Sequence, residues 1–361
     1  MRLCPALLIA LAACGGTSAS TIDGATARDA AIDAIAAPDA APPITAPSET
    51  WTWVPIDGMQ CGDGSPTGIG VNLTDRSDRI LVYLQGGGAC WDAATCFQVM
   101  SAAYVTTGYG EADFTAEIAS VGQSYIFQRT GANPFADASW IYVPYCTGDL
   151  HSGDATPSYS DNGTPRTVHH VGRANLARVL ARAAATRPAA DTVWLVGVSA
   201  GGFGVAFNYA AARAAWPGAA AFRALADSAP LVTMEATRWA AMQASWHLAF
   251  PAGCTTCATD LGAMPAALRG AMRATDRYGL LANTGDQTIT TYFGLTNLGL
   301  ASATIAEQAA MPAGSGQAAW LTAGTSHVVL ANPLLVAGGI SVQDWVARWA
   351  TGDAAWANAG P

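Results

Sequence analysis

A serine in a glycine-rich turn is the most chemically suggestive feature of the sequence. Residues 197–201 read Gly-Val-Ser-Ala-Gly and match the pattern G-x-S-x-G, with Ser199 at the centre. In this pattern the serine lies on a sharp turn between a strand and a helix, which exposes its hydroxyl above the edge of a sheet. An apolar run over 193–198 precedes the turn, and an apolar, helix-like stretch to about Trp216 follows it. We therefore interpret Ser199 as a nucleophile; the alternative is a glycine-rich turn that holds an incidental serine.

A serine nucleophile needs a base to accept its proton and an acid to orient that base. Two histidines follow Ser199 in the chain, His247 and His327. His247 lies in an aromatic, helix-like stretch and is interpreted as structural, whereas His327 lies in a Gly-Thr-Ser loop where a base could reach the serine. The chain order serine, acid, histidine is typical of hydrolases with this turn, and Asp227 and Asp286 both end predicted strands. The spacing favours Asp286 and keeps Asp227 as the alternative.

The elements that must position these residues are predicted strands alternating with predicted helices. Apolar runs over 79–84, 140–145, 193–198, 222–226 and 278–283 read as buried strands. Strands that alternate with helices indicate an α/β protein with a mainly parallel sheet and helices on both faces. In such sheets the sites form at the carboxyl ends of the strands, where these serine and aspartate residues are expected.

Three consecutive glycines, 86–88, directly follow the predicted strand over 79–84. Glycines leave the backbone free to turn its N–H groups towards one point, as an acyl-transfer enzyme requires where the oxyanion forms. The alternative is a flexible turn without a catalytic role.

The N-terminal segment predicts export. Met1 to Ser20 has a basic residue, Arg2, followed by a short apolar run, and Leu-Ala-Ala-Cys-Gly at 11–15 resembles the lipobox of bacterial lipoproteins. This resemblance implies a signal peptide over 1–13, lipidation of Cys14, and a bacterial lipoprotein of the outer membrane or cell surface, attached to the membrane through its lipid. An ordinary secretory signal is the alternative.

Composition divides the rest of the chain into two parts. Residues 14–50 are rich in Ala, Asp, Pro and Thr, so they are expected to form a disordered tether. Residues 51–361 are expected to form one catalytic domain. A net charge of −9 argues against a nucleic-acid partner. All 17 basic residues are arginines, which excludes mechanisms that need a lysine.

Eight cysteines are present, and six remain once Cys4 and Cys14 are set aside. In an exported protein an even number predicts disulfides. The close spacing favours Cys90–Cys96 and Cys254–Cys257, which leaves Cys61–Cys146. A zinc site or a redox role at 254–257 is a weaker alternative, because no second ligand pair and no thioredoxin-like context accompany it.

Six short segments carry a family resemblance when they are taken together. They are 61–66 (CGDGSP), 83–90 (YLQGGGAC), 143–149 (VPYCTGD), 197–202 (GVSAGG), 225–229 (LADSA) and the strand and turn that reach Asp286. This combination resembles the pectin acetylesterase family, which includes the animal Notum deacylases. Gln85 is a departure, since the family usually has Glu there, and Ala89 stands where an aromatic residue is common.

The resemblance implies an α/β-hydrolase fold and a serine esterase mechanism without a metal or an organic cofactor. It implies Ser199 as nucleophile, Asp286 as acid and His327 as base, and an oxyanion hole formed by the N–H groups of Gly87, Gly88 and Ala200.

We therefore expect a monomeric carboxylic ester hydrolase that removes acetyl groups from a polysaccharide such as pectin. A deacylase for longer acyl chains is one alternative, since Trp91, Phe203, Trp239 and Trp246 could form an apolar wall, although they could equally belong to the core. A catalytically inactive, carbohydrate-binding surface lipoprotein is the other.

Overall fold

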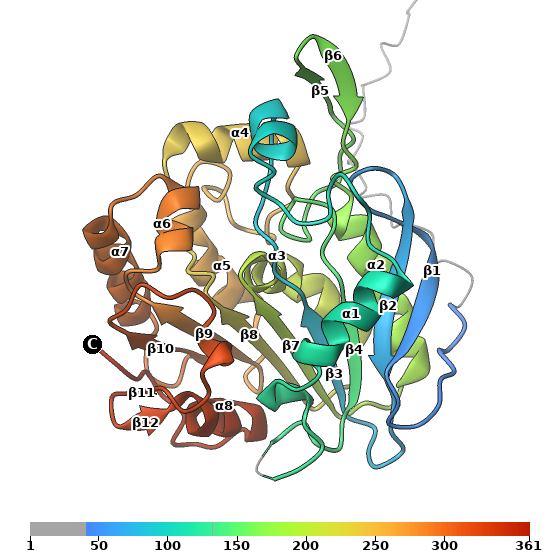
Figure 1. Ribbon diagram of the computed structural model, residues 1–361. Helices are drawn as coiled ribbons and strands as arrows, with labels where there is room; N and C mark the ends of the chain where they lie inside the picture. Colours follow the sequence, from blue (N-terminus) through green and yellow to red (C-terminus); the bar gives the residue numbers. More distant parts are fainter. Residues whose placement is uncertain (1–40, 132) are drawn as a thin grey trace, which may run out of the picture. The chain divides into compact units, whose positions relative to one another are not determined.

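The computed structural model describes residues 41–131 and 133–361 (Figure 1). The predicted signal peptide, Cys14 and most of the predicted tether lie outside the described residues. Within the described part of the chain, no helix is long and apolar enough to cross a membrane.

An eight-stranded sheet forms the centre of the fold, in the order β1-β2-β4-β3-β7-β8-β9-β10. The strands from β4 to β10 run parallel to one another, and β2 is antiparallel to both of its neighbours. Their bounds are β1 (Thr52–Gln60), β2 (Pro66–Asn72), β3 (Ile80–Leu84), β4 (Ser139–Val143), β7 (Thr192–Val198), β8 (Ala221–Asp227), β9 (Arg277–Asn283) and β10 (Gln317–Thr322). This arrangement confirms the mainly parallel α/β sheet that the sequence predicts.

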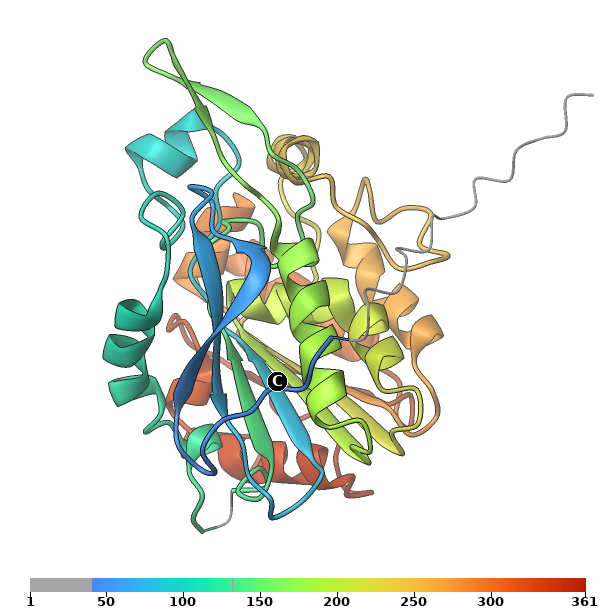
Figure 2. The same cartoon turned by 90° about the vertical axis from the view of Figure 1, so that its right-hand side faces the viewer.

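Helices cover both faces of the sheet (Figures 1 and 2). The α-helices are α1 (Glu111–Val121), α2 (Gly172–Thr186), α3 (Ala200–Ala215), α4 (Ala236–Trp246), α5 (Met264–Ala271), α6 (Gln287–Phe293), α7 (Asn297–Ala309) and α8 (Val342–Thr351). Two small hairpins complete the strands, β5 (Ser158–Asp161) with β6 (Thr164–Thr167) and β11 (Val336–Ala337) with β12 (Ile340–Ser341). Short helical turns occur at Ala94–Gln98, Tyr125–Phe127, Leu261–Ala263 and Val329–Ala331.

Strand β3 shows why the central strands are apolar without interruption. Ile80 and Val82 pack in the core that contains α2 and α3, whereas Leu81 and Tyr83 pack in the core on the other face, which contains α8. Because successive side chains of a strand point to opposite faces, a strand that is covered on both sides must be apolar at every position. Each such buried side chain contributes roughly 1.5–3 kcal/mol relative to exposure.

The folded unit begins before residue 51, where the sequence analysis placed its boundary. Ile44 is 5% exposed and belongs to the core cluster, and its N–H donates to Thr186 Oγ1. Glu49 N–H donates to Leu73 O, and the Glu49 carboxylate pairs with Arg76. The predicted tether therefore ends earlier than residue 50, because a single isoleucine within a polar, proline-rich stretch gains enough apolar contact to be held in the core.

Three disulfides join Cys61 to Cys146, Cys90 to Cys96 and Cys254 to Cys257, the same pairs that the spacing of the cysteines favours. With its cysteines paired, the segment 254–257 is neither a zinc site nor a dithiol.

Candidate active site

Ser199 lies in the sharp turn that its sequence pattern predicts. It follows β7, precedes α3 and has φ 54° and ψ −122°, a conformation that is strained for a side chain with a Cβ. Its N–H donates to Asp227 O over 2.8 Å, which fixes the turn against the end of β8. A Cβ on Gly201 would lie 2.0 Å from Leu84 O, so the backbone of α3 can approach β3 only with glycine at that position. The G-x-S-x-G pattern thus reflects the close packing that this turn requires.

Asp286 and His327 form a hydrogen-bonded pair. Asp286 follows β9 and is 1% exposed; its Oδ1 accepts from Ile289 N, and its Oδ2 lies 2.7 Å from His327 Nδ1. An imidazole that donates from Nδ1 to a carboxylate carries its lone pair on Nε2. His327 Nε2 is buried and has no hydrogen-bond partner among the described residues. This nitrogen is therefore available as a proton acceptor.

The carboxylate of Asp227 is occupied by other groups. It is fully buried and accepts hydrogen bonds from Val329 N at 2.9 Å, Leu330 N at 2.8 Å and Ser228 Oγ at 3.0 Å. Burial raises the pKa of Asp227 to about 6, while the hydrogen bonds from the two backbone N–H groups oppose the rise. Because its backbone carbonyl also holds Ser199 N, Asp227 links the serine turn to the loop that follows the histidine. Its position agrees with the preference for Asp286 that the spacing suggests.

His247, the other histidine after the serine, ends helix α4 in a left-handed backbone conformation with φ 51°. Among the described residues, no hydrogen bond joins its side chain to Ser199 or to either aspartate.

The three glycines at 86–88, here called the glycine loop, lie directly against Ser199. A Cβ on Gly86 would be 3.0 Å from Ser199 Cβ, and Gly88 lines the same cavity as Ser199 and Ala200. Gly88 has φ 79°, and a Cβ there would lie 2.1 Å from Ser101 O, so this position also requires glycine. The N–H groups of Gly87 and Gly88 donate to no other described residue. Ala200 N begins α3, where a backbone N–H has no partner within the helix. Gly87 itself does not line the cavity.

A half-buried hydrogen-bond network that no sequence motif revealed joins the residue before this loop to helix α1. Gln85 Nε2 donates to Glu117 Oε2 over 2.7 Å, and Gln85 Oε1 accepts from Tyr145 N over 2.8 Å. The Gln85 carbonyl lies 2.8 Å from His151 Nε2. An amide at position 85 donates to Glu117, whereas a glutamate would place two carboxylates side by side. Gln85, which stands where the family usually has Glu, can therefore donate a hydrogen bond to the Glu117 carboxylate.

Glu117 also accepts hydrogen bonds from three tyrosine hydroxyls, those of Tyr104, Tyr109 and Tyr142, each within 2.9 Å. Burial raises the pKa of Tyr104 to about 12, and its hydrogen bond to Glu117 adds to the shift. The phenols are therefore neutral donors at pH 7. Glu117 lies on α1, in a segment without a recognisable motif, so only the tertiary structure reveals its role.

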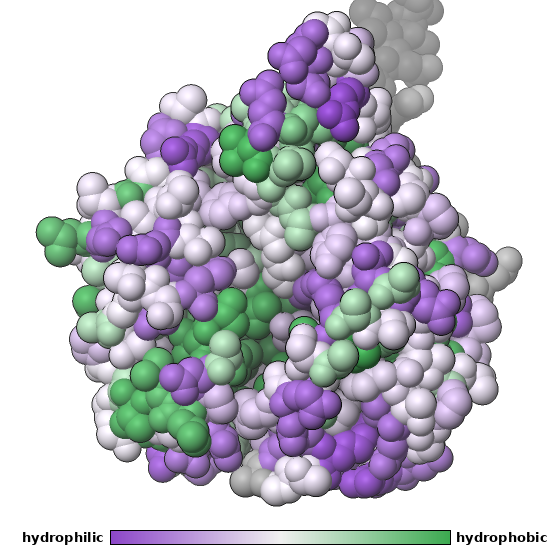
Figure 3. All heavy atoms as spheres, viewed as in Figure 1, coloured by the Kyte–Doolittle hydropathy of each residue, from purple (hydrophilic) through white to green (hydrophobic). Residues whose placement is uncertain are grey.

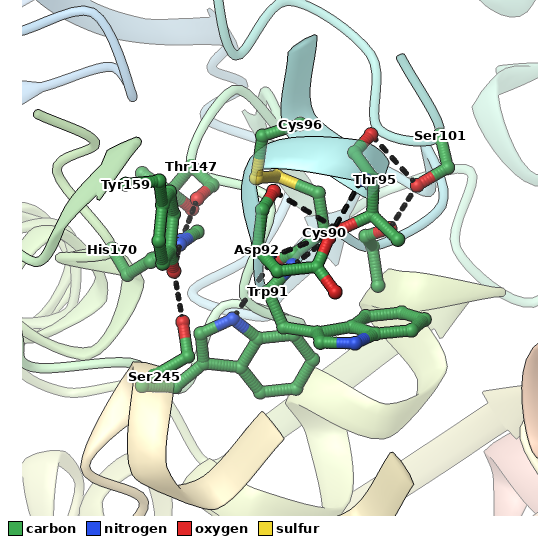
Figure 4. The surroundings of a disulfide bond; sticks show 12 residues. Cys90, Trp91, Asp92, Thr95, Cys96, Ser101, Thr147, Tyr159, His170 and Ser245 are labelled. Carbon is green, nitrogen blue, oxygen red and sulfur yellow. Dashed lines mark hydrogen bonds between the residues drawn. A yellow bond between two sulfur atoms is a disulfide. The ribbon is translucent and has the colours of Figure 1, made fainter. Parts of the chain in front are cut away.

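The Cys90–Cys96 disulfide closes the segment that follows the glycine loop (Figure 4). Trp246 Nε1 donates to Cys90 O over 2.9 Å, so Trp246 is a core residue. His170 Nδ1 lies 2.7 Å from Thr147 O, and burial lowers its pKa to about 4. The ligand atoms of Cys90, Cys96 and His170 lie within 4.8 Å of one another, but sulfurs bonded in a disulfide are not thiolate ligands.

A small apolar cavity of about 30 Å³ opens beside Ser199. Of the aromatic residues proposed as an apolar wall, Phe203 and Trp239 line it, while Trp246 and Trp91 do not. The full lining consists of Gly88, Ala89, Leu150, Ser199, Ala200, Phe203, Met234, Trp239, Met242, Leu261, Ile289, Tyr292 and Phe293. Most of these side chains come from α3, α4 and α6, the helices nearest to the carboxyl ends of β7 to β9.

Comparison with known proteins identifies the family. The profile of the pectinacetylesterase family matches residues 52–322, which is most of the chain. The protein belongs to the pectinacetylesterase family.

Curated relatives of this pectinacetylesterase-family chain include palmitoleoyl-protein carboxylesterase NOTUM of Homo sapiens, 29% identical over 155 residues. The Drosophila melanogaster protein of the same name is 29% identical over 156 residues. These matches cover 42% of this chain but only 29% and 22% of the respective relatives. The chain thus matches less than a third of the length of these relatives. An inactive palmitoleoyl-protein carboxylesterase notum1b of Danio rerio also matches, at 29% identity over 109 residues, which are 29% of this chain and 73% of that protein.

Two crystal forms of the Wnt deacylase Notum from Drosophila share the fold, with TM-scores of 0.64 and 0.66. They are 17% and 18% identical to this chain and cover 85% and 84% of it and 94% of the Notum chain. At this level of identity the likeness establishes the α/β-hydrolase fold of this family member.

Proposed function

We propose that the protein is a serine carboxylic ester hydrolase with Ser199 as nucleophile, His327 as base and Asp286 as the acid that orients the base. The observation that carries this proposal is the 2.7 Å hydrogen bond between Asp286 Oδ2 and His327 Nδ1, with Nε2 left unpaired. Membership of the pectinacetylesterase family supports the same class of reaction.

In the proposed mechanism, Ser199 Oγ attacks the ester carbonyl carbon while His327 Nε2 accepts the serine proton. The carbonyl oxygen becomes an oxyanion that the N–H groups of Gly87, Gly88 and Ala200 stabilise. When the tetrahedral intermediate collapses, the ester C–O bond breaks and the imidazolium gives its proton to the leaving alcohol. Water, deprotonated by Nε2, then hydrolyses the acyl-enzyme and regenerates the serine.

Ser199 Oγ and His327 Nε2 do not form a hydrogen bond in the described structure. In unliganded enzymes such bonds are often long and shorten only when substrate binds. The hydrogen bond with Asp286 leaves the lone pair of the imidazole on Nε2, and we expect substrate binding to bring Ser199 Oγ within hydrogen-bond distance of it.

The cavity favours a short acyl group. Its volume of about 30 Å³ accommodates an acetyl methyl group but not an extended fatty-acyl chain. We therefore propose acetyl esters, such as those of an acetylated polysaccharide like pectin, as substrates. A longer-chain deacylase is the second candidate, because the curated relatives are named palmitoleoyl-protein carboxylesterases and because Met234 and Met242 are flexible enough to widen the cavity.

The first test is hydrolysis of p-nitrophenyl esters from acetate to palmitate, with Ser199→Ala as the matched control. We expect activity with acetate and propionate, a loss of at least ~10³-fold in Ser199→Ala with an unchanged melting temperature, and labelling of wild type alone by a fluorophosphonate. A maximum at medium or long chains would favour the longer-chain deacylase. No activity and no labelling would overturn the esterase and favour a carbohydrate-binding lipoprotein without catalysis.

We also propose that Cys14 carries a lipid anchor that holds a monomeric enzyme at the outer membrane or cell surface. Mass spectrometry of the mature N-terminus, with Cys14→Ser as the control, tests the lipid. A mature chain without a modified cysteine would contradict it.

A further inference from the structure

A second cavity lies at the opposite end of the sheet from Ser199. Its volume is about 670 Å³, and its walls come from the amino ends of β8, β9 and β10 together with the C-terminal segment 352–358. The residues proposed for catalysis lie at the carboxyl ends of the strands, so this cavity is separate from the candidate active site. Its lining contains several alanine and glycine residues, which leave its interior open.

Two arginines stand side by side in this cavity. Arg223 on β8 and Arg277 on β9 are direct cross-strand partners and both line it. Like charges opposite each other on neighbouring strands destabilise a sheet. A fold that keeps this pair needs a compensating negative charge.

Arg223 has no such partner within the described protein. It is 9% exposed, its Nε is fully buried without a hydrogen-bond acceptor, and its guanidinium forms no ion pair with any described residue. A buried and unpaired cation is unfavourable unless an anion approaches it. Asp276 also lines the cavity: its carboxylate pairs with Arg213, its Oδ2 accepts from the hydroxyl of Tyr209, and its Oδ1 is buried without a hydrogen-bond partner. Its negative charge partly offsets the fall in the pKa of Arg223 that burial and Arg277 cause, but it does not form an ion pair with Arg223.

Arg277 and Trp356 form the other side of the same cavity. Arg277 donates to Arg348 O at 3.1 Å and Asp353 O at 2.8 Å, which holds its guanidinium in place. Its Cζ lies 5.1 Å from the centre of the Trp356 ring. Trp356 Nε1 is buried and also lacks a hydrogen-bond partner among the described residues. Two cations therefore line the open space, with the Trp356 ring beside Arg277.

We infer that this cavity is a binding site for an organic anion whose carboxylate or phosphate group is held by Arg223 and Arg277. The guanidinium group matches both oxyanions through paired N–H donors. The volume lies within the range of small-molecule sites and exceeds what a lone inorganic ion needs, so the ligand has an organic body that packs beside Trp356. This site is independent of the ester chemistry proposed for Ser199.

Calorimetric titration of the full-length protein with galacturonate, citrate and inorganic phosphate tests the site. We expect saturable binding of galacturonate or citrate, a melting temperature that rises with the concentration of that anion, and binding weakened about tenfold or more by Arg223→Met or Arg277→Gln. Binding of inorganic phosphate alone would overturn the organic ligand. The carboxylates and the phosphate distinguish which oxyanion the site prefers.

The matched control is Arg178→Gln, which removes an exposed arginine on α2 that does not line the cavity and should leave binding unchanged. In an otherwise wild-type chain, Arg223→Met should leave p-nitrophenyl acetate hydrolysis unchanged and should not lower the melting temperature of the free protein. Absence of saturable binding for all three anions, or binding that survives both Arg223→Met and Arg277→Gln, would overturn the proposal. Failure of the esterase assay would not affect it.

Discussion

The two aspartates that end neighbouring strands perform different tasks. Asp286 holds the imidazole of His327, whereas Asp227 holds the backbone N–H groups of Val329 and Leu330 and, through its carbonyl, Ser199 N. The side-chain partners of each carboxylate, rather than its place in the chain, distinguish the proposed acid, Asp286, from Asp227, which binds backbone N–H groups.

Asp286→Asn should therefore reduce kcat for p-nitrophenyl acetate by ~10³–10⁴-fold with little effect on melting temperature, because the amide no longer orients the imidazole. Asp227→Asn should chiefly lower the melting temperature, since Val329 N and Leu330 N donate to different carboxylate oxygens and the amide would present an NH2 donor to one of them. The reverse pattern would show that Asp227 is the acid.

At the scale of single elements, α1 supports the glycine loop through one side chain. Glu117 joins Gln85 to three tyrosine hydroxyls, and Gln85 directly precedes the glycines. Helix α1, which contributes no residue to the cavity, is thus connected to the loop that holds the proposed oxyanion donors.

Glu117→Ala should lower kcat roughly tenfold or more with a smaller change in KM, since displaced N–H donors weaken transition-state stabilisation more than substrate binding. Glu111→Gln, an exposed change on the same helix, is the control. Equal kinetics in both variants would mean that the network has no part in positioning the loop.

Helix α7 carries a buried carboxyl group that responds to pH. Glu307 is 7% exposed, its Oε2 accepts from Leu231 N and its Oε1 has no partner among the described residues. Burial raises the pKa of Glu307 from 4.5 to about 8. The folded state therefore binds this proton more tightly than the unfolded state does.

The contribution of the Glu307 proton to the free energy of unfolding is fully present below about pH 4.5 and is lost as the pH rises through about 8. Over that window the free energy of unfolding should fall by up to ~1.4 kcal/mol per pH unit from this group. Glu307→Gln should remove this contribution. Urea denaturation at several pH values should therefore show that the free energy of unfolding of the variant, relative to that of wild type, increases as the pH rises. If the free energies of unfolding of the two proteins changed with pH in the same way, the raised pKa of Glu307 would be contradicted.

At the scale of the whole molecule, the disulfides differ in how much of the chain they constrain. Cys61–Cys146 spans 85 residues and ties the turn between β1 and β2 to the segment after β4. Cys254–Cys257 spans 3 residues. The chain-entropy effect of a cross-link grows with the length of the loop that it closes.

Replacing both members of the pair Cys61 and Cys146 with alanine should lower the free energy of unfolding by ~4.6 kcal/mol, and the same change at Cys254 and Cys257 by only ~2 kcal/mol. Denaturant titration of the two double variants makes the comparison. Equal losses would mean that loop length does not determine the contribution here.

The surface of the molecule also carries exposed apolar residues. Figure 3 shows an apolar patch where β11 and β12 lie, and Leu334 and Val336 in this region are 75% and 58% exposed. Nothing in the sequence separates these residues from the apolar residues of the core.

The sequence by itself determined the sheet class, the serine turn, the glycine loop and the cysteine pairs favoured by spacing. These features depend on local patterns, namely apolar runs that must be buried on two faces and glycines that allow close backbone contact. Strands β1, β2 and β10 were not predicted. The apolar positions of β1 and β2 are interrupted, β10 is a short run with two alanines, and pairing with neighbouring strands decides the conformation of all three.

Only the tertiary structure decided which carboxylate contacts His327, that Ile44 belongs to the core, and that Glu117 supports the glycine loop. It also brought Arg223 and Arg277 together from strands more than 50 residues apart in the chain. Each of these contacts joins residues that are remote in sequence and carry no local signal, because strand order and register, rather than spacing along the chain, place them side by side.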